Sequence, residues 1–184
     1  MPSGLTISTG RASTHSEGPG HQRSVGEILN AFDRLDLNEN TYVLFGSDHG
    51  EMNMEHRQQL KNSMYEASAR VPLIVADPDV VQDRVVDDLV SLVDLYPTFM
   101  DMTGLDHPPD LAGTSLMPEL QGERADRPDS VLCQYHGNFA NTGEFMIRRG
   151  SHKYIAYAGY ESQLFNVETD PDEIDNLVEK EPAL

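Results

Sequence analysis

The sequence predicts an α/β fold, a partial doubly wound mixed sheet that is followed by a small antiparallel sheet with a helix. Three observations carry this prediction. Residues 24–37 place apolar side chains at helical spacing and lead into a short apolar run at 41–46, which is typical of a strand covered on both faces. A similar apolar run follows at 71–75. After residue 130, four short strand-like runs alternate with glycine or polar turns.

Two further segments carry helix signals. The segment 85–104 predicts a helix that ends at Gly104, because glycine most readily adopts the left-handed conformation that follows a helix. The segment 170–178 predicts a last helix, since Asp170 is a good N-cap and Glu173 suits the third helical position. The buried stripe expected for the first of these helices consists of Leu92, Leu95, Tyr96, Phe99 and Met100.

The change of texture along the chain predicts its organisation. We expect a disordered lead-in over 1–21, an α/β part over 22–125, and a small β-meander with a helix over 126–184. The lead-in is rich in Ser, Thr, Gly and His and has no apolar core, so we expect no secretory signal in this chain. No stretch reaches the roughly 18–20 apolar residues that span a bilayer. We expect a soluble chain, and its compartment stays open.

Charge and cysteine content exclude some classes of partner and of cross-link. The chain has 31 acidic against 13 basic residues, a formal net charge of -18. Nucleic acids and anionic membrane surfaces need Lys and Arg for their phosphates, so neither is an expected partner. The one cysteine, Cys133, excludes an intrachain disulfide.

A polar cluster comes directly after the apolar run at 41–46. Ligands of doubly wound sheets bind at the carboxyl ends of strands, where Asp48 and His49 stand. Asp supplies a hard anionic oxygen, neutral His supplies a nitrogen, and Gly50 lets the backbone bend away. A cation site is one interpretation, and an ordinary turn capped by Asp is the other. Further on, Lys61 offers a compact positive charge that could hold an anionic oxygen.

The wider sequence resembles the sulfatases of the alkaline-phosphatase superfamily. Several separated blocks match in the family's order, and together they cover about residues 22–180. The resemblance implies an alkaline-phosphatase-like fold. The blocks are "SDHGE" at 47–51, "EHRQ" at 55–58, "SMYEASARVPLIV" at 63–75, "SLVDLYPTFMDMTGL" at 91–105, "LAGTSLMP" at 111–118, "HKYI" at 152–155 and "QLFNVETDPDEIDNL" at 163–177.

The resemblance also implies roles for particular side chains and a cofactor, Ca2+. The family's reaction runs through a formylglycine hydrate that attacks sulfur, and the metal spreads the charge that develops on the sulfate oxygens. The implied metal ligands are Asp48 and His49, the implied catalytic contact with the sulfate is Lys61, and the implied substrate contacts are His56, Arg57 and His136. Both His56 and His136 have an alternative interpretation as ordinary exposed histidines.

The chain departs from the family at the nucleophile. Formylglycine forms from Cys or Ser in a C/S-x-P-x-R motif, which this sequence does not contain; Cys133 is followed by Gln134 and Tyr135. The early acidic pair that completes the family's calcium site is also missing. We therefore expect the C-terminal portion of a sulfatase, with weak calcium binding and no activity on its own.

Other functions stay open at this point. The expected substrates are sulfated saccharides, 2-sulfated uronates among them, or aryl sulfate esters. A phosphate or phosphonate ester hydrolase of the same superfamily would share the Asp-His pair. A non-catalytic remnant is the third possibility: its open sheet edge would pair with an N-terminal half or with a second copy of the chain.

Overall fold

The computed structural model describes residues 5–7, 19–76, 81, 83–137 and 140–181. The chain forms two compact units, each described below by itself. Most of the expected lead-in, 1–21, lies outside the described residues, although 5–7 form a strand and a helix starts at Pro19. The first unit comprises 1–47, 72–87 and 92–126, and the second comprises 48–71, 88–91 and 127–184. The segment 48–71, which we grouped with the α/β part, thus lies in the second unit.

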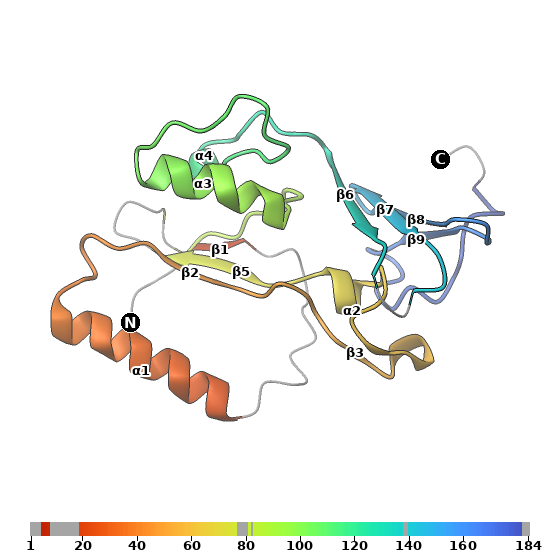
Figure 1. The fold of residues 1–184 in the computed structure, drawn as a ribbon, viewed down its shortest axis with the longest axis horizontal. Helices are drawn as coiled ribbons and strands as arrows, with labels where there is room; N and C mark the ends of the chain where they lie inside the picture. The colour runs from red at the N-terminus through yellow and green to blue at the C-terminus, as the bar shows by residue number, and fades with distance from the viewer. Residues whose placement is uncertain (1–4, 8–18, 77–80, 82, 138–139, 182–184) are drawn as a thin grey trace. The chain divides into compact units, whose positions relative to one another are not determined.

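The first unit contains a three-stranded sheet (Figure 1). Its central strand is β5 (Leu73–Ala76), with β1 (Leu5–Ile7) on one side and β2 (Val43–Gly46) on the other. Both apolar runs of the sequence are therefore strands, and Val75 of β5 is fully buried. Both pairings of β5 are antiparallel, so the described part of the predicted mixed sheet contains no parallel pair. The link from β2 to β5 contains a hairpin, a 3-10 turn and a four-residue helix, not the single long helix that usually connects parallel strands.

Three helices belong to the same unit: α1 (Pro19–Leu35), α3 (Leu95–Met102) and α4 (Met117–Leu120). A short 3-10 turn, Leu92–Asp94, precedes α3, so this helix begins later than its apolar pattern predicts. Its predicted end is confirmed. Gly104 has φ 65°, its N–H donates to the Asp101 carbonyl at 3.1 Å, and the next N–H donates to Met100 O at 2.9 Å. This is the Schellman pattern that stops a helix.

The predicted buried stripe of α3 is wrong: Leu95 and Met100 are half-buried, and the other three residues are exposed. The exposed fractions are 40%, 51% and 44% for Leu92, Tyr96 and Phe99. The buried face instead carries Asp94 and Thr98. Their oxygens accept hydrogen bonds from the backbone N–H groups of Thr114, at 2.8 Å, and Leu116, at 2.9 Å. These polar side chains satisfy backbone N–H groups of the loop, so hydrogen bonding contributes to which face of α3 turns inward, together with buried Pro97.

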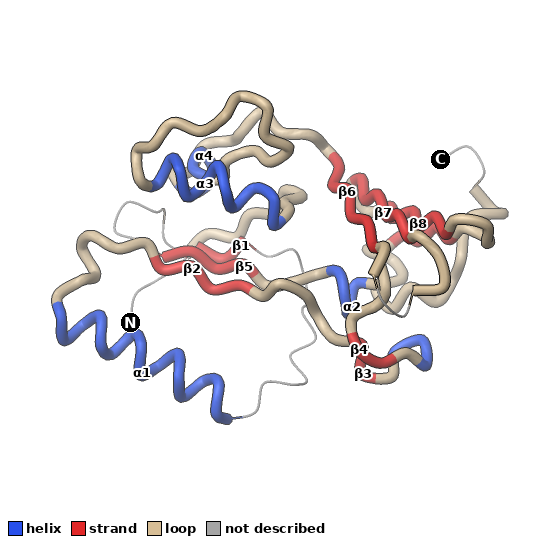
Figure 2. Tube along the Cα trace, viewed as in Figure 1, coloured by secondary structure: helices blue, strands red, loops and turns tan. Residues whose placement is uncertain are grey.

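The second unit is built on a four-stranded antiparallel meander, which confirms the four strand-like runs (Figure 2). Its strands are β6 (Ser130–Tyr135), β7 (Glu144–Arg149), β8 (His152–Tyr157) and β9 (Gln163–Asn166), in that order. A hairpin of β3 (Met52–Asn53) and β4 (Gln59–Leu60) and the helix α2 (Glu66–Ala69) complete the unit. The core contains Met52, Met64, Tyr65, Met146, Ile155, Phe165 and Val167.

A buried ionic cluster joins α2 to this meander. The Nζ of Lys153, which is fully buried, lies 2.9 Å from Glu66 Oε1 and 2.8 Å from Glu173 Oε1. The other oxygen of Glu66 contacts Arg148 at 2.9 Å and Arg70 at 3.3 Å. We call these five residues the ionic cluster. Each buried carboxylate has at least one cationic partner, which is the condition under which charges tolerate burial.

The predicted helix over 170–178 does not form; the segment makes successive turns. Glu173 has φ 53°, a left-handed conformation that a helix cannot contain. Its carboxylate points into the ionic cluster and also accepts a hydrogen bond from the N–H of Glu66 at 2.6 Å. Asp170 still caps the segment, because its Oδ2 accepts from the N–H of Asp175 at 2.8 Å. Tertiary contacts of Glu173 thus override a valid local helix signal.

None of the helices in the described residues is long and apolar enough to cross a membrane. The longest, α1, has 17 residues.

Replacing Lys153 by Met should destabilise the protein by about 3–5 kcal/mol, because the buried carboxylate of Glu173 loses its cation and Glu66 loses one of its three cationic partners. Urea unfolding at pH 7 measures this change. Lys180→Met is the matched control. Lys180 pairs with Asp175 at 2.6 Å on an exposed surface, so its loss should cost less than about 1 kcal/mol. Equal effects of the two substitutions would contradict a stabilising role of the buried pair.

The ionic cluster should also make stability depend on acid pH. Burial by itself raises the pKa of Glu66, but Lys153, Arg148 and Arg70 outweigh burial, and the net pKa is lowered. A lowered pKa stabilises the folded state above the unfolded pKa, near 4.5, and this stabilisation is lost as the pH falls through the folded value. Unfolding free energies at pH 7 to pH 3 should therefore fall more steeply below 4.5 in the native chain than in Glu66→Gln. Parallel curves for the two proteins would refute this linkage.

Candidate functional site

The loop that carries Asp48 and His49 is held by the backbone of α2. The N–H of Gly50 donates to Ser68 O at 2.7 Å, and the N–H of Glu51 donates to Ala67 O at 2.9 Å. A Cβ atom at residue 50 would lie 2.0 Å from the carbonyl oxygen of Ala67. Only glycine allows this approach, so the glycine that the sequence suggested for a bend is required by the contact with α2.

The side chains of Asp48 and His49 contact each other. His49 Nδ1 lies 2.7 Å from the carbonyl oxygen of Gly50, and His49 Nε2 lies 3.5 Å from Asp48 Oδ2. In the tautomer that carries its proton on Nδ1, His49 donates to that carbonyl and its Nε2 faces the Asp48 carboxylate. Metal-binding histidines commonly hold their second nitrogen in this way. The carboxylate itself is 83% exposed, so both donors can reach one cation.

These two donors fit only part of a calcium site. Among the described residues, no group of three or more His, Cys, Asp or Glu side chains could hold a metal ion. Ca2+ takes about six to eight ligands, mostly oxygens. Asp48 and His49 therefore stay predicted ligands, and the described residues do not supply the remaining ones.

The exposed Lys61 follows the β3–β4 hairpin. The Ser68 hydroxyl donates to its carbonyl oxygen at 2.6 Å, so the same short helix positions the backbone of Lys61 and the loop at Gly50. The buried part of this arrangement is Ser68, which is 3% exposed. The exposed ammonium of Lys61 can therefore bind an anionic oxygen without breaking a buried ion pair.

The predicted substrate residues His56 and Arg57 lie in the 3-10 turn of the β3–β4 hairpin. Both have left-handed backbones, with φ of 49° and 59°, and Met54 and Leu60 share this feature with φ of 78° and 70°. The His56 ring stacks on the ring of Tyr65 with centroids 3.8 Å apart and planes 2° apart. Strained non-glycine backbones occur more often at ligand sites than elsewhere, so we keep this turn as a candidate substrate contact.

The sixth predicted residue, His136, is exposed just after β6. Its ring makes an edge contact with Phe145 of β7, with centroids 5.0 Å apart. The structure therefore brings Asp48 and His49 together and connects Lys61 to their loop through Ser68. His136 makes its ring contact with the meander instead.

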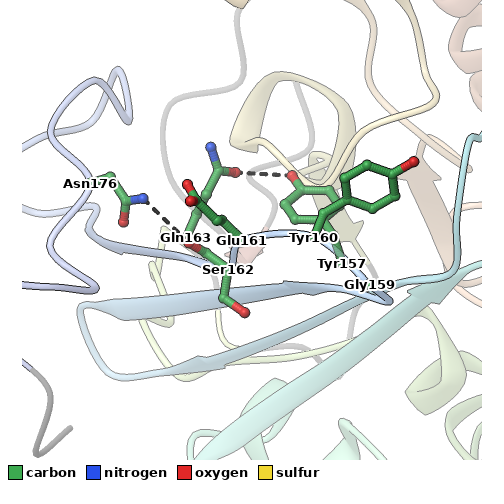
Figure 3. A pocket seen from close by; sticks show the side chains of 7 residues that line it. All are labelled: Tyr157, Gly159, Tyr160, Glu161, Ser162, Gln163 and Asn176. Atoms are coloured by element: carbon green, nitrogen blue, oxygen red, sulfur yellow. Dashed lines mark hydrogen bonds between the residues drawn. The ribbon is translucent and has the colours of Figure 1, made fainter.

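Two neighbouring pockets of the second unit contain polar residues that the sequence analysis missed. One, of about 590 Å³, includes Gln58, Asn62, Thr142 and Glu144; the other, of about 750 Å³, includes Ser162 and Asn176 (Figure 3). Tyr157 and Tyr160 line both. One sequence signal could have found Glu144. It stands two residues before buried Met146 on β7, and the period of two along a strand turns both side chains inward.

Replacing Gly50 by Ala should disturb the Asp48–His49 loop directly, because the added methyl group collides with Ala67 O. We expect a loss of about 1–3 kcal/mol in unfolding free energy and faster hydrogen exchange at the Glu51 amide. Gly26→Ala in α1 is the control: no atom lies within 4 Å of its added Cβ, so stability should stay unchanged or rise. Normal exchange at Glu51 in Gly50→Ala would disprove the close contact.

Comparison with known proteins places this geometry in a family. The family model described as N-sulphoglucosamine sulphohydrolase, C-terminal, matches residues 54–183. Arylsulfatase K of Mus musculus is 44% identical over 170 residues, which cover 87% of this chain and 31% of the relative. Arylsulfatase K of Homo sapiens is 42% identical, with 87% and 32% covered. The chain thus spans about a third of the length of these relatives.

Solved structures agree in fold. A 2-O GAG sulfatase superposes with a TM-score of 0.82 at 31% identity, covering 88% of this chain and 37% of that one. A structure in complex with D-glucosamine-2-N,6-O-disulfate gives 0.80 at 28% identity, with 86% and 34% covered. The phosphonate monoester hydrolase of Agrobacterium radiobacter gives 0.77 at 26% identity, with 85% and 34% covered. The predicted alkaline-phosphatase-like fold class is confirmed, and the chain belongs to the sulfatase family, whose C-terminal region it matches.

Proposed function

We propose that this chain is the C-terminal part of a hydrolase that cleaves sulfate esters of saccharides. One observation carries the proposal: Asp48 and His49 adjoin in a loop that α2 fixes, with the His49 Nε2 directed to the carboxylate side. The matched family model and the arylsulfatase K relatives support the sulfate ester as the bond that is cleaved.

In the proposed site, Asp48 and His49 hold a calcium ion from one side. When bound, the ion supplies a positive charge that stabilises negative charge on the sulfate oxygens. Lys61 holds a sulfate oxygen through its ammonium group, which fixes the ester in place without needing directional geometry. The strained turn with His56 and Arg57, together with His136, contacts the sugar.

This sequence does not contain the motif that supplies the family's nucleophile. Its one cysteine, Cys133, lies on β6 within "VLCQY" and not within a C/S-x-P-x-R motif. No serine of the sequence stands in such a motif either, so we assign no step of bond cleavage to the described residues. The 184-residue chain alone should therefore not turn over 4-nitrophenyl sulfate.

The substrate class that we favour is a 2-sulfated uronate of a glycosaminoglycan-like saccharide. One similarity supports it: the neighbour described as a 2-O GAG sulfatase, at 31% identity. We do not assign Arg148 to the uronate carboxylate, because its Nη1 lies 2.9 Å from Glu66 Oε2 in the ionic cluster.

A second candidate is a phosphonate or phosphate ester hydrolase. The similarity to the phosphonate monoester hydrolase of Agrobacterium radiobacter favours it, at a lower identity than the sulfatase relatives. Both reactions use a metal beside a tetrahedral anion, so the Asp-His pair does not separate them. A C/S-x-P-x-R motif in the parent reading frame favours sulfate, and a plain Thr or Ser nucleophile favours phosphate.

We expect the native chain to bind calcium weakly, with a Kd of about 1 mM or above, because only two ligands are present. The Asp48→Asn variant should show no calcium binding. Isothermal titration calorimetry with CaCl2 measures it. In the presence of calcium, Lys61→Met should weaken binding of methyl 2-O-sulfo-glucuronide about tenfold, through the loss of a charge-assisted hydrogen bond.

The control is Lys180→Met, which removes an exposed lysine of the same unit and should leave both affinities unchanged. Calcium binding by Asp48→Asn at native strength would remove the metal assignment. Unchanged binding of the sulfated sugar by Lys61→Met would remove the sulfate contact. Tighter binding of methylphosphonate than of the sulfate ester would favour the second candidate.

A further inference from the structure

The pocket of about 590 Å³ in the second unit contains a buried acid with an unused oxygen. Glu144, the first residue of β7, is 9% exposed. Its Oε2 has no hydrogen-bond partner among the residues that the structure describes. Buried polar atoms are nearly always hydrogen-bonded, and an unpaired one destabilises the folded state. Glu144 therefore keeps hydrogen-bonding capacity that no described residue uses.

The walls around Glu144 are polar but carry no positive charge among the described lining residues. Amide groups come from Gln58, Asn62 and Asn141, and hydroxyl groups from Thr142, Tyr157 and Tyr160. Such groups both donate and accept hydrogen bonds. A sulfate, phosphate or carboxylate placed beside Glu144 would meet a like charge without a compensating cation, so the pocket disfavours anions.

The walls are fixed in place by their own hydrogen bonds. The Tyr135 hydroxyl donates to the amide oxygen of Asn62 at 2.9 Å, and the Thr142 hydroxyl donates to the carbonyl oxygen of Ala158 at 2.5 Å. The Tyr157 hydroxyl donates to Gln163 at 2.9 Å, a bond drawn in Figure 3. A pocket with preset walls loses little conformational entropy when a ligand binds.

We propose that this pocket binds an uncharged, hydroxyl-bearing sugar ring, with Glu144 accepting hydrogen bonds from its hydroxyl groups. A volume of about 590 Å³ lies within the range of small-molecule sites. The exposed ring of Tyr160, at 67%, offers an apolar surface to one face of the sugar. The proposal deepens the proposed function, on which it rests for the saccharide class: a sugar unit next to the sulfated one would occupy the pocket.

The test uses the intact 184-residue chain and needs no turnover. Methyl β-D-glucopyranoside is titrated while 1H–15N amide spectra are recorded. We expect saturable shifts at the amides of Thr142, Glu144 and Tyr157. Glu144→Leu removes the carboxylate in a similar volume, so it should weaken sugar binding at least tenfold. The same substitution should raise the melting temperature by about 2–4 °C, because it removes the buried unpaired oxygen.

Two further variants make the result specific. Glu144→Gln keeps one acceptor oxygen and should bind the sugar within about threefold of the native affinity, since a neutral acceptor still suits a hydroxyl donor. Glu168→Leu removes an exposed acid after β9 and should change neither affinity nor melting temperature.

Three results would overturn the proposal: no saturable shifts with the native chain, native affinity in Glu144→Leu, or a lower melting temperature in that variant. The last would show that the carboxylate serves the fold itself. None of these results bears on calcium binding by Asp48 or on binding of the sulfated sugar by Lys61. Failure of this pocket is therefore distinguishable from failure of the proposed function.

Discussion

The second unit depends on the pairing of Lys153 with Glu66 and Glu173. A fully buried ammonium is tolerated only because two carboxylates face it at 2.9 and 2.8 Å. The three residues come from β8, from α2 and from the turns after β9, so one interaction joins three segments that are distant in sequence. A hydrophobic substitute could fill the space, but it could not fix the orientation of a four-residue helix, which has little stability of its own.

The orientation of α2 decides where the candidate site residues lie. Glu66 at its start binds the ionic cluster, while Ser68 near its end accepts from the Gly50 N–H and donates to the Lys61 carbonyl. The proposed metal ligands and the proposed sulfate contact are thus positioned by one residue of a short helix, through the Ser68 carbonyl and hydroxyl groups. This arrangement explains how the backbone positions of Asp48 and Lys61 are fixed, although their exposed side chains make few contacts.

Sequence patterns predicted correctly those elements whose conformation depends on residues close together in the chain. Alternation found the four meander strands, and Gly104 marked the end of α3, because each signal and its cause lie in the same few residues. The sequence failed where a distant partner decides. Glu173 leaves its predicted helix to reach Lys153, and Thr98 turns inward to meet Leu116. The contact between Asp48 and His49 could be expected because the two residues are adjacent, whereas the unpaired oxygen of Glu144 exists only in the folded environment.

The strained hairpin shows how stability and site are connected. Its non-glycine residues with left-handed backbones, Met54, His56, Arg57 and Leu60, each cost of the order of 1–3 kcal/mol. Backbone bonds across the turn recover part of this, as between the Met54 N–H and Gln58 O at 2.9 Å. The stack of His56 on buried Tyr65 ties the turn to the core that the meander forms. A relaxed loop would connect β3 to β4 at lower energy, so the strain favours a role for this turn in contacting a ligand.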